Sequence, residues 1–332
     1  MQVINDTLSG LTFGKVQAFS NLTLYPLMSK AALDPDYLVL DEALERKLAR
    51  VTEVSEGGSV PELAFENDSD ISVLLLDGEE LIGARQNRIL NITILAGCHS
   101  KTLIPVSCVE QGRWRYNSRE FDSSDRALFL KARAKKAQRV SASMRDTGER
   151  SSDQREVWND IAEKSEVFFC RSESGAMADV YEQEKVRLDE YVGAFRAEPG
   201  QTGAVFAIDG RIAGIELFDC SKTFAKYLPK LLRSYAMDAA ETVKPKTVPP
   251  VEAAVKAFIE EMKAAAVERF RALGKGEDLR LESETVAGGA LVDGERVVHL
   301  AAFKVDAPTP RARRAAKGRR SGTGSSGADT VR

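Results

Sequence analysis

Three Asp-Gly pairs, each placed between two apolar runs, are the feature that most constrains how this chain folds. Asp-Gly tolerates the positive φ angles that a two-residue hairpin turn requires. The pairs are Asp77-Gly78 in SVLLLDGEELIG, Asp209-Gly210 in GAVFAIDGRIAGIELF and Asp293-Gly294 in GALVDGERVVHLAAF. Each pair predicts a β-hairpin, and three hairpins predict a substantial antiparallel sheet.

Helical periodicity dominates the middle of the chain. Apolar residues recur at helical spacing in stretches that begin near residues 151, 174 and 221, and a fourth helix follows VPP, residues 248–250. Ser151 with Gln154 three residues later has the capping-box pattern of a helix start. Pro250 near the first turn and Gly274 as a stop predict the bounds of the last helix. The segment 126–145, rich in Lys and Arg, is a further helix candidate.

The N-terminal third has the pattern of strands. KVQAFSNLTLYPLM, residues 15–28, alternates apolar and polar residues as a half-buried strand does. Residues 35–54 predict a strand, a short helix and another strand. We therefore expect an α+β fold, in which an antiparallel sheet with several β-hairpins is packed by a helical middle segment. We expect a single domain over 1–305, or two interlocked subdomains, a strand-rich 1–120 and a helix-rich 121–305 with two hairpins.

Charge is distributed unevenly along the chain. The segment 306–332 carries seven Lys or Arg residues against two Asp, although the whole chain has a formal net charge of −3. The acidic remainder disfavours a nucleic-acid-binding core. We expect the tail to be disordered. It acts either as a solubilising extension or as a weak contact for nucleic acid or another anionic surface.

Composition narrows the classes of function. No stretch approaches the roughly 20 apolar residues that span a bilayer, and the N-terminus has no secretory signal pattern, so we expect a cytoplasmic protein without membrane contact. The four cysteines lie far apart and only two histidines occur. Neither a zinc site nor a disulfide framework is indicated, and no metal ligands are assigned. Carboxylates, Arg and amides must supply most of the chemistry.

One polar segment, EELIGARQNR, directly follows the first Asp-Gly pair. As one returning strand it would place odd-numbered side chains on one face and even-numbered ones on the other. Its polar members are Glu79, Glu80, Arg85, Gln86, Asn87 and Arg88. Two interpretations remain open. The segment is either an ion-paired sheet edge or a rigid strand that grips an anionic or sugar-bearing ligand.

A second polar segment is IPVSCVEQGRWRY, residues 104–116. Cys108 and Glu110 alternate onto one side of a strand, and Arg113 and Trp114 follow a Gln-Gly turn. An indole beside a guanidinium is a platform for a base or sugar ring, or else a core anchor beside a surface Arg. Cys108 is more typical of a buried strand thiol than of a nucleophile.

A third polar segment, VTEVSEGGSVPEL, surrounds a Gly-Gly loop with carboxylates. They are Glu53, Glu56 and Glu62. Glycines next to carboxylates can make a pocket for a cation or ligand. The alternative is a solvated loop.

Six motifs of the chain, taken together, resemble one known family. They are VTEVSEGGSVPEL, LLLDGEELIGARQNRILN, IPVSCVEQGRWRY, SDQREVW, AMADVYE and LRSYAMDA. In this order they closely resemble the ARPP domain family, whose name records association with ADP-ribosylglycohydrolases and rhodanese-phosphatases. The resemblance runs from about residue 10 to 304 and leaves the basic tail outside. Arg85 departs from the Lys that is usual there, which weakens only a role that needs a neutral amine.

The resemblance implies a protein that processes or binds an ADP-ribose-like or NAD-derived nucleotide, and it carries no established reaction. Paired carboxylates suit hydrolysis of a nucleotide-sugar or phosphoester bond. Glu80 or Glu110 would be the general acid or base, and Mg²⁺ would help if three carboxylates converge. Ligand contacts would come from Glu79, Arg85, Gln86, Asn87, Arg88, Arg113 and Trp114, with Glu56 and Cys108 as further candidates.

This hypothesis depends on one spatial condition and has one alternative. The polar side chains after Asp77-Gly78 must converge with those near Trp114 around a shared cavity. The alternative function is a non-catalytic protein-interaction or assembly module, in stress or phage defence, which presents the same polar strand to a protein partner.

Overall fold

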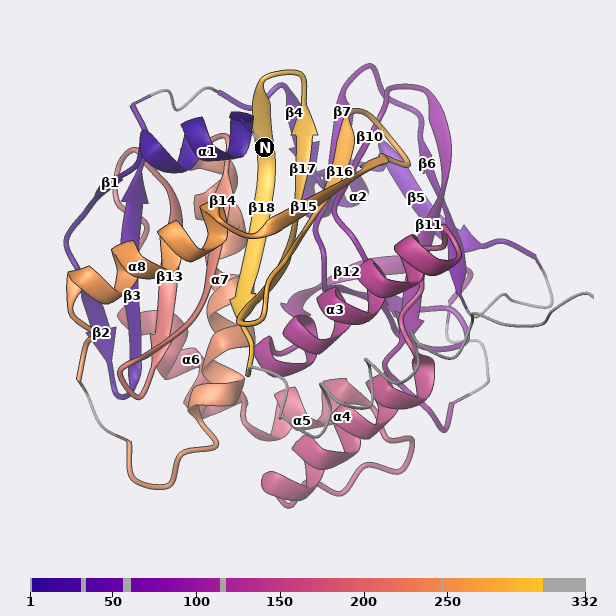
Figure 1. Cartoon of the computed structure of the whole chain (residues 1–332). Helices are drawn as coiled ribbons and strands as arrows, with labels where there is room; N and C mark the ends of the chain where they lie inside the picture. Colours follow the sequence, from indigo (N-terminus) through magenta and orange to yellow (C-terminus); the bar gives the residue numbers. More distant parts are fainter. Residues whose placement is uncertain (1, 31–33, 56–60, 114–117, 246–247, 307–332) are drawn as a thin grey trace, which may run out of the picture.

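The computed structural model describes residues 2–30, 34–55, 61–113, 118–245 and 248–306 (Figure 1). Within these ranges the strands form a nine-stranded sheet, a three-stranded sheet and a closed six-stranded barrel. The pairing between strands is antiparallel except for one pair in the three-stranded sheet. Eight helices pack around these sheets, which confirms the α+β class. No helix in the described ranges has the length and apolar character needed to cross a membrane.

The nine-stranded sheet joins the first strands of the chain to the last ones. Its order is β1-β3-β13-β14-β18-β17-β16-β15, with β2 paired to β3. The strands are β1 (Thr12–Phe13), β2 (Gln17–Phe19), β3 (Leu22–Met28), β13 (Gln201–Ile208), β14 (Arg211–Phe218), β15 (Ala266–Arg271), β16 (Glu277–Glu282), β17 (Val286–Asp293) and β18 (Arg296–Lys304). Asp209-Gly210 and Asp293-Gly294 connect paired strands, so both of these predicted hairpins are confirmed.

Helices cover both faces of this sheet (Figure 1). The helices α1 (Gln2–Ser9) and α8 (Glu252–Lys263) pack on one face, and α6 (Lys185–Ala194) and α7 (Ser221–Ala239) pack on the other. Alternation along β13 explains this arrangement. Val205 belongs to the core beneath α8, and the Phe206 ring stacks on Tyr235 of α7 with centroids 4.0 Å apart. The helix expected to reach Gly274 ends at Lys263 instead.

The barrel and the three-stranded sheet occupy the other half of the molecule (Figure 1). The small sheet has the order β10-β7-β4, and α2 (Leu40–Glu45) follows β4. Its strands are β4 (Tyr37–Val39), β7 (Ser72–Leu75) and β10 (Ile94–Ala96). The barrel has the order β11-β6-β5-β12-β8-β9 and closes between β9 and β11. Its strands are β5 (Ala49–Glu53), β6 (Glu62–Asn67), β8 (Glu79–Gly83), β9 (Arg88–Leu90), β11 (Ser100–Cys108) and β12 (Glu120–Ala127).

The first Asp-Gly pair makes a turn but not the predicted hairpin. The preceding strand, β7, belongs to the three-stranded sheet, whereas the following strand, β8, belongs to the barrel. Gly78 has a φ of 81°. Its N–H donates to the Leu90 carbonyl at 2.9 Å, and its carbonyl accepts from Leu128 N at 2.8 Å. Both backbone groups of Gly78 therefore bond to residues outside the turn. At this turn the chain passes from the three-stranded sheet to the barrel.

Residues 79–88 are two strands and a turn, and the expectation of one strand is wrong. β8 ends at Gly83, where φ is 139°, and β9 returns antiparallel with Leu81 opposite Arg88. A Cβ at Gly83 would lie 2.5 Å from the Glu120 carbonyl oxygen, so only Gly fits there. The turn interrupts the strand at this glycine, so the alternation of side chains predicted for residues 84–88 does not hold.

Four helices lie between the barrel and β13. They are α3 (Leu130–Asp146), α4 (Gln154–Val167), α5 (Met177–Gln183) and α6. The first confirms the helix expected in the Lys- and Arg-rich segment. The stretch from 174 divides into α5 and α6 at Glu184. The N-cap of α4 is Asp153, whose carboxylate accepts from Arg155 N at 3.0 Å, so the cap predicted at Ser151 is wrong.

Candidate functional site

One end of the barrel carries a cluster of polar side chains, which we call the barrel-end cluster. Its members are Gln86, Asn87, Arg88, Cys108, Glu110 and Arg113. They come from the β8–β9 turn and from the end of β11, which lie side by side because Val109 N donates to the Asn87 carbonyl at 3.1 Å. The sequence hypothesis required these two segments to converge around a shared cavity. They converge, but the adjoining groove is lined from the second segment and not by residues 79–88.

Arg113 joins the two segments of the barrel-end cluster. Its Nε donates to Glu110 Oε2 at 2.8 Å, and its Nη2 donates to Asn87 Oδ1 at 3.0 Å. Its Nη1 donates to the Ala84 carbonyl at 3.0 Å. Its side chain is 10% exposed. With all three nitrogens engaged, Arg113 clamps the turn to the end of β11.

Glu110 is held in its ionised form. Burial opposes ionisation, but Arg113, the backbone N–H of Asn87 and the Ser174 hydroxyl together outweigh burial and lower the pKa of the carboxyl. Asn87 N lies 3.3 Å from Oε2, and the Ser174 hydroxyl donates to Oε1 at 3.0 Å. An ionised carboxylate can accept a proton or stabilise a developing positive charge.

Gln86 links the remaining members of the barrel-end cluster. Its Nε2 donates to the Glu110 carbonyl at 2.7 Å. Its Oε1 accepts from the Cys108 thiol at 3.1 Å and from Arg88 Nη1 at 3.3 Å. Cys108 is 1% exposed, and burial raises the pKa of its thiol to about 11. A neutral, enclosed thiol is a poor nucleophile. Arg88 is 0% exposed, and burial lowers the pKa of its guanidinium.

The adjacent carboxylates of β8 point to different surroundings. Glu80 accepts from Arg126 Nε at 2.7 Å and from the Ser124 hydroxyl at 2.9 Å. Asn87 Nδ2, 3.5 Å from Glu80, connects it to the barrel-end cluster. Glu79, on the opposite face of the strand, pairs with Lys230 of α7 at 2.5 Å. Both carboxylate side chains are fully buried.

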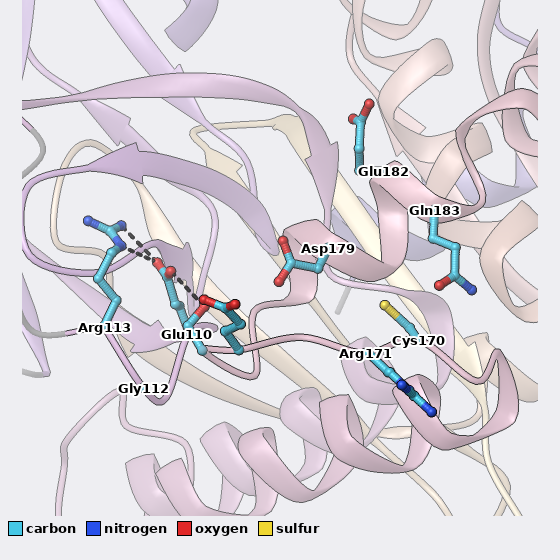
Figure 2. Close-up of a pocket in the computed structure, with 10 residues that line it drawn as sticks. Glu110, Gly112, Arg113, Cys170, Arg171, Asp179, Glu182 and Gln183 are labelled. Atoms are coloured by element: carbon cyan, nitrogen blue, oxygen red, sulfur yellow. Dashed lines mark hydrogen bonds and ion pairs between the residues drawn. The ribbon is translucent and has the colours of Figure 1, made fainter.

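An open groove of about 880 Å³ borders the barrel-end cluster. Figure 2 shows Glu110 and Arg113 on one side of it and Cys170, Arg171 and Gln183 on the other, with Asp179 between them. Its other lining residues are Gly112, Glu173, Ser174 and Glu182. The two walls meet at Gly112, whose N–H donates to the Ser174 carbonyl at 2.7 Å.

The far wall of the groove carries side chains that were not among the sequence candidates. Arg171 is exposed and has no hydrogen bond or ion pair among the described residues. Asp179 accepts from the Ser172 hydroxyl at 2.5 Å. The only sequence signal for them is a polar run between two helices, CRSES, and the Asp of AMADVYE. Nothing in their spacing places them opposite Glu110.

Several predicted positions lie elsewhere or cannot be placed. Arg85 is partly buried in the β8–β9 turn and does not line the groove. Trp114 and Glu56 lie outside the described residues, as does the tail from residue 307. In the described ranges, no group of three or more His, Cys, Asp or Glu side chains is placed to hold a metal ion.

Fold and site together define an α+β protein in which a polar groove opens at the end of a closed barrel, beside a helix-covered sheet. The chain belongs to the ARPP-1 family, because the model of the ARG and Rhodanese-Phosphatase-superfamily-associated Protein domain matches residues 10–303. This confirms the family resemblance. The family is associated with the ADP-ribosylglycohydrolase and rhodanese-phosphatase superfamilies. No curated protein and no solved structure matches the chain.

Proposed function

We propose that the groove binds an ADP-ribose-like nucleotide and that the protein hydrolyses a glycosidic or phosphoester bond of that nucleotide. The observation that carries the proposal is the ionised Glu110 carboxylate on one wall, with the guanidinium of Arg171, unpaired among the described residues, on the other. The groove volume of about 880 Å³ suits a ligand of this size. The association of the family with ADP-ribosylglycohydrolases supports the same substrate class.

Arg171 supplies the phosphate contact in this proposal. It is exposed and unpaired among the described residues, so it can turn towards a pyrophosphate and bind two oxygens with its planar fork. Arg113 already holds Glu110 and Asn87, so it serves as a clamp. Arg88 is enclosed in the barrel. The phosphate contact in this proposal therefore comes from the far wall and not from Arg85, Arg88 or Arg113, which were predicted from the sequence as ligand contacts.

Glu110 carries the chemical role. When a glycosidic bond breaks, positive charge develops on the sugar carbon, and an ionised carboxylate stabilises that charge or takes the proton of the attacking water. Glycoside hydrolysis commonly requires a second carboxyl group, and Glu173, Asp179 and Glu182 also line the groove. Of these, Asp179 lies between the two walls. Glu80 is enclosed and hydrogen-bonds Asn87 at 3.5 Å, so its part is to position the turn.

Calorimetry with ADP-ribose, ADP and NAD tests the binding. Arg171→Ala should weaken ADP-ribose binding by about tenfold or more, since a charge-assisted contact is lost. Arg155→Ala is the matched control, because Arg155 is equally exposed but does not line the groove. No heat with any of the three ligands, or equal affinity in wild type and Arg171→Ala, would overturn the proposal.

A turnover assay tests the chemistry separately. Glu110→Gln should retain nucleotide binding and lose hydrolysis, because the amide cannot accept the proton of water. Hydrolysis of ADP-ribose or NAD at the wild-type rate by Glu110→Gln would remove Glu110 from the reaction.

A further inference from the structure

Inside the barrel, two charged side chains have buried polar atoms without hydrogen-bond partners in the described structure. Arg88 of β9 is 0% exposed, and its Nε and Nη2 have no hydrogen-bond partner in the described structure. Both carboxylate oxygens of Glu53, on β5, are likewise buried and unpartnered. A buried donor or acceptor without a partner is costly, and a charged one more so. Each group therefore indicates that a hydrogen-bonding partner from outside the chain binds here.

Strand order places these two groups on opposite walls of the barrel. β9 and β5 are separated by β8 and β12 in one direction and by β11 and β6 in the other. Glu53 shares the inward face of β5 with Val51, and Arg88 lies opposite Leu81, both of which belong to the barrel core. Each group is attracted by the other's charge, yet they form no ion pair. They lie on opposite walls of the barrel interior.

The chemistry of the two groups restricts the kind of molecule that would satisfy both. Nε and Nη2 are the two donors on one edge of the guanidinium, the edge that binds an acceptor in a bidentate manner. An anion there would satisfy Arg88 and be repelled by Glu53, and a cation would do the reverse. A neutral group with an acceptor at one end and a donor at the other satisfies both.

We propose that Arg88 and Glu53 form a binding subsite for the neutral polar end of the nucleotide, a carboxamide or a ribose diol. The group accepts hydrogen bonds from the Arg88 edge and donates to Glu53. This inference rests on the proposed function and extends it, because Gln86 joins the two places. Its side chain contacts Arg88 Nη1 at 3.3 Å and the carbonyl of Glu110, a groove residue, at 2.7 Å.

Ligand-observed NMR with nicotinamide, ribose and inorganic phosphate as separate probes tests the subsite. Nicotinamide or ribose should bind the wild-type protein, and phosphate should not compete. Arg88→Lys keeps the charge but loses the two-donor edge, and Glu53→Leu loses the acceptor. Each variant should raise the dissociation constant of the neutral probe by about tenfold or more. Arg50→Met is the control, because Arg50 lies on the outer face of β5, where it pairs with Asp68 at 2.6 Å.

The outcomes separate this inference from the proposed function. If neither neutral probe binds, if phosphate binds more tightly than both, or if Arg88→Lys and Glu53→Leu bind like wild type, the subsite is overturned. ADP-ribose binding that depends on Arg171 would still support the groove in that case. Nicotinamide or ribose binding without any nucleotide binding would support the subsite and overturn the groove function. Circular dichroism melts establish that each variant is folded.

Discussion

The side-chain amide of Gln154 satisfies both backbone hydrogen-bonding groups of Cys108. Its Oε1 accepts from Cys108 N at 2.8 Å, and its Nε2 donates to the Cys108 carbonyl at 2.8 Å. The first residue of α4 therefore takes the place of a neighbouring strand at the end of β11. Cys108 pairs with Arg88 of β9 on its other edge, so Gln154 helps to fix the backbone on which the barrel-end cluster stands.

Gln154→Leu should destabilise the protein, because it leaves both backbone groups of Cys108 without partners. The expected loss in the free energy of unfolding is about 1–3 kcal/mol for each unpaired group, measured by urea denaturation. Gln2→Leu is the control, since Gln2 only bonds Asp6 at an exposed site, and should change stability by less than about 0.5 kcal/mol. Equal losses in the two variants would contradict this role of Gln154.

Gly112→Ala should disturb the groove. A Cβ at Gly112 would lie 2.9 Å from Ser174 Cα and 3.2 Å from the Ser174 carbonyl oxygen, and both are backbone atoms that cannot yield cheaply. We expect a loss of about 1–3 kcal/mol in stability together with weaker nucleotide binding. Gly193→Ala, within α6, meets nothing within 4 Å and should stabilise the helix by up to about 1 kcal/mol. An unchanged groove affinity in Gly112→Ala would show that the contact with Ser174 does not shape the site.

The ionisation of Glu110 should make stability depend on pH in the acid range. Burial raises the pKa of the Glu110 carboxyl, and Arg113 more than offsets this rise. The pKa in the folded protein therefore lies below that in the unfolded chain, which is about 4.3. The stabilisation is therefore fully present above that value and is lost as pH falls through the lowered folded pKa. The stability difference between wild type and Glu110→Gln should be constant near neutral pH and shrink below about pH 4. Thermal melts across this range measure it, and a difference that stays constant throughout would refute the coupling.

Breaking the buried ion pair between Arg133 and Glu216 should be among the most destabilising single changes. Nη1 of Arg133 donates to Glu216 at 2.6 Å, and both side chains are fully buried. Arg133→Met leaves a buried carboxylate with only His299, at 3.2 Å, and Tyr235, at 3.3 Å, as partners. The expected loss is about 3–5 kcal/mol. Removing the exposed pair of Arg145 and Glu268 should cost less than about 1 kcal/mol.

A double variant distinguishes loss of pairing from loss of packing at this position. Arg133→Met combined with Glu216→Leu removes both charges and should recover part of the stability that either single change loses. Chemical denaturation of the two single variants and the double variant measures this coupling. Strictly additive losses would mean that the two charges do not depend on each other.

The cysteines should differ sharply in reactivity towards a thiol reagent at neutral pH. Cys98 is exposed, whereas Cys108 is buried and burial raises the pKa of its thiol to about 11. Because the thiolate is the reactive form, Cys98 should be labelled quickly in the native protein and Cys108 only after unfolding. Cys98→Ser should abolish the fast phase of labelling, followed by mass spectrometry. Rapid native labelling of Cys108 would restore it as a candidate nucleophile.

Turn chemistry alone predicted two of the three hairpins correctly and the third wrongly. Asp209-Gly210 and Asp293-Gly294 join strands that pair with each other, so the preference of Asp-Gly for positive φ angles was enough to predict them. Asp77-Gly78 has the same turn chemistry, but its flanking strands pair with distant partners. Which strands pair depends on burial of the whole chain, and no turn residue encodes it.

The candidate site was likewise predictable from the sequence only in part. Glu110 and Arg113 are three residues apart, so the sequence alone places them close enough to pair. Their convergence with Gln86 and Asn87 was expected, although the alternation used to place these residues failed at Gly83. Arg171 lies about sixty residues further along the chain, and nothing in its surroundings marks it as part of the groove.

The sequence by itself determined the α+β class, the two hairpins of the large sheet, most helices and the family, because each follows from short-range periodicity, turn chemistry or motif order. Only the tertiary structure decided that six of the eight strands between residues 49 and 127 close into a barrel, that Glu53 and Arg88 lie on its opposite walls, and that Arg171 lies across from Glu110. These relationships join residues far apart in the chain. They arise from packing that buries apolar faces together, and such packing carries polar side chains into positions that their own neighbours in sequence do not specify.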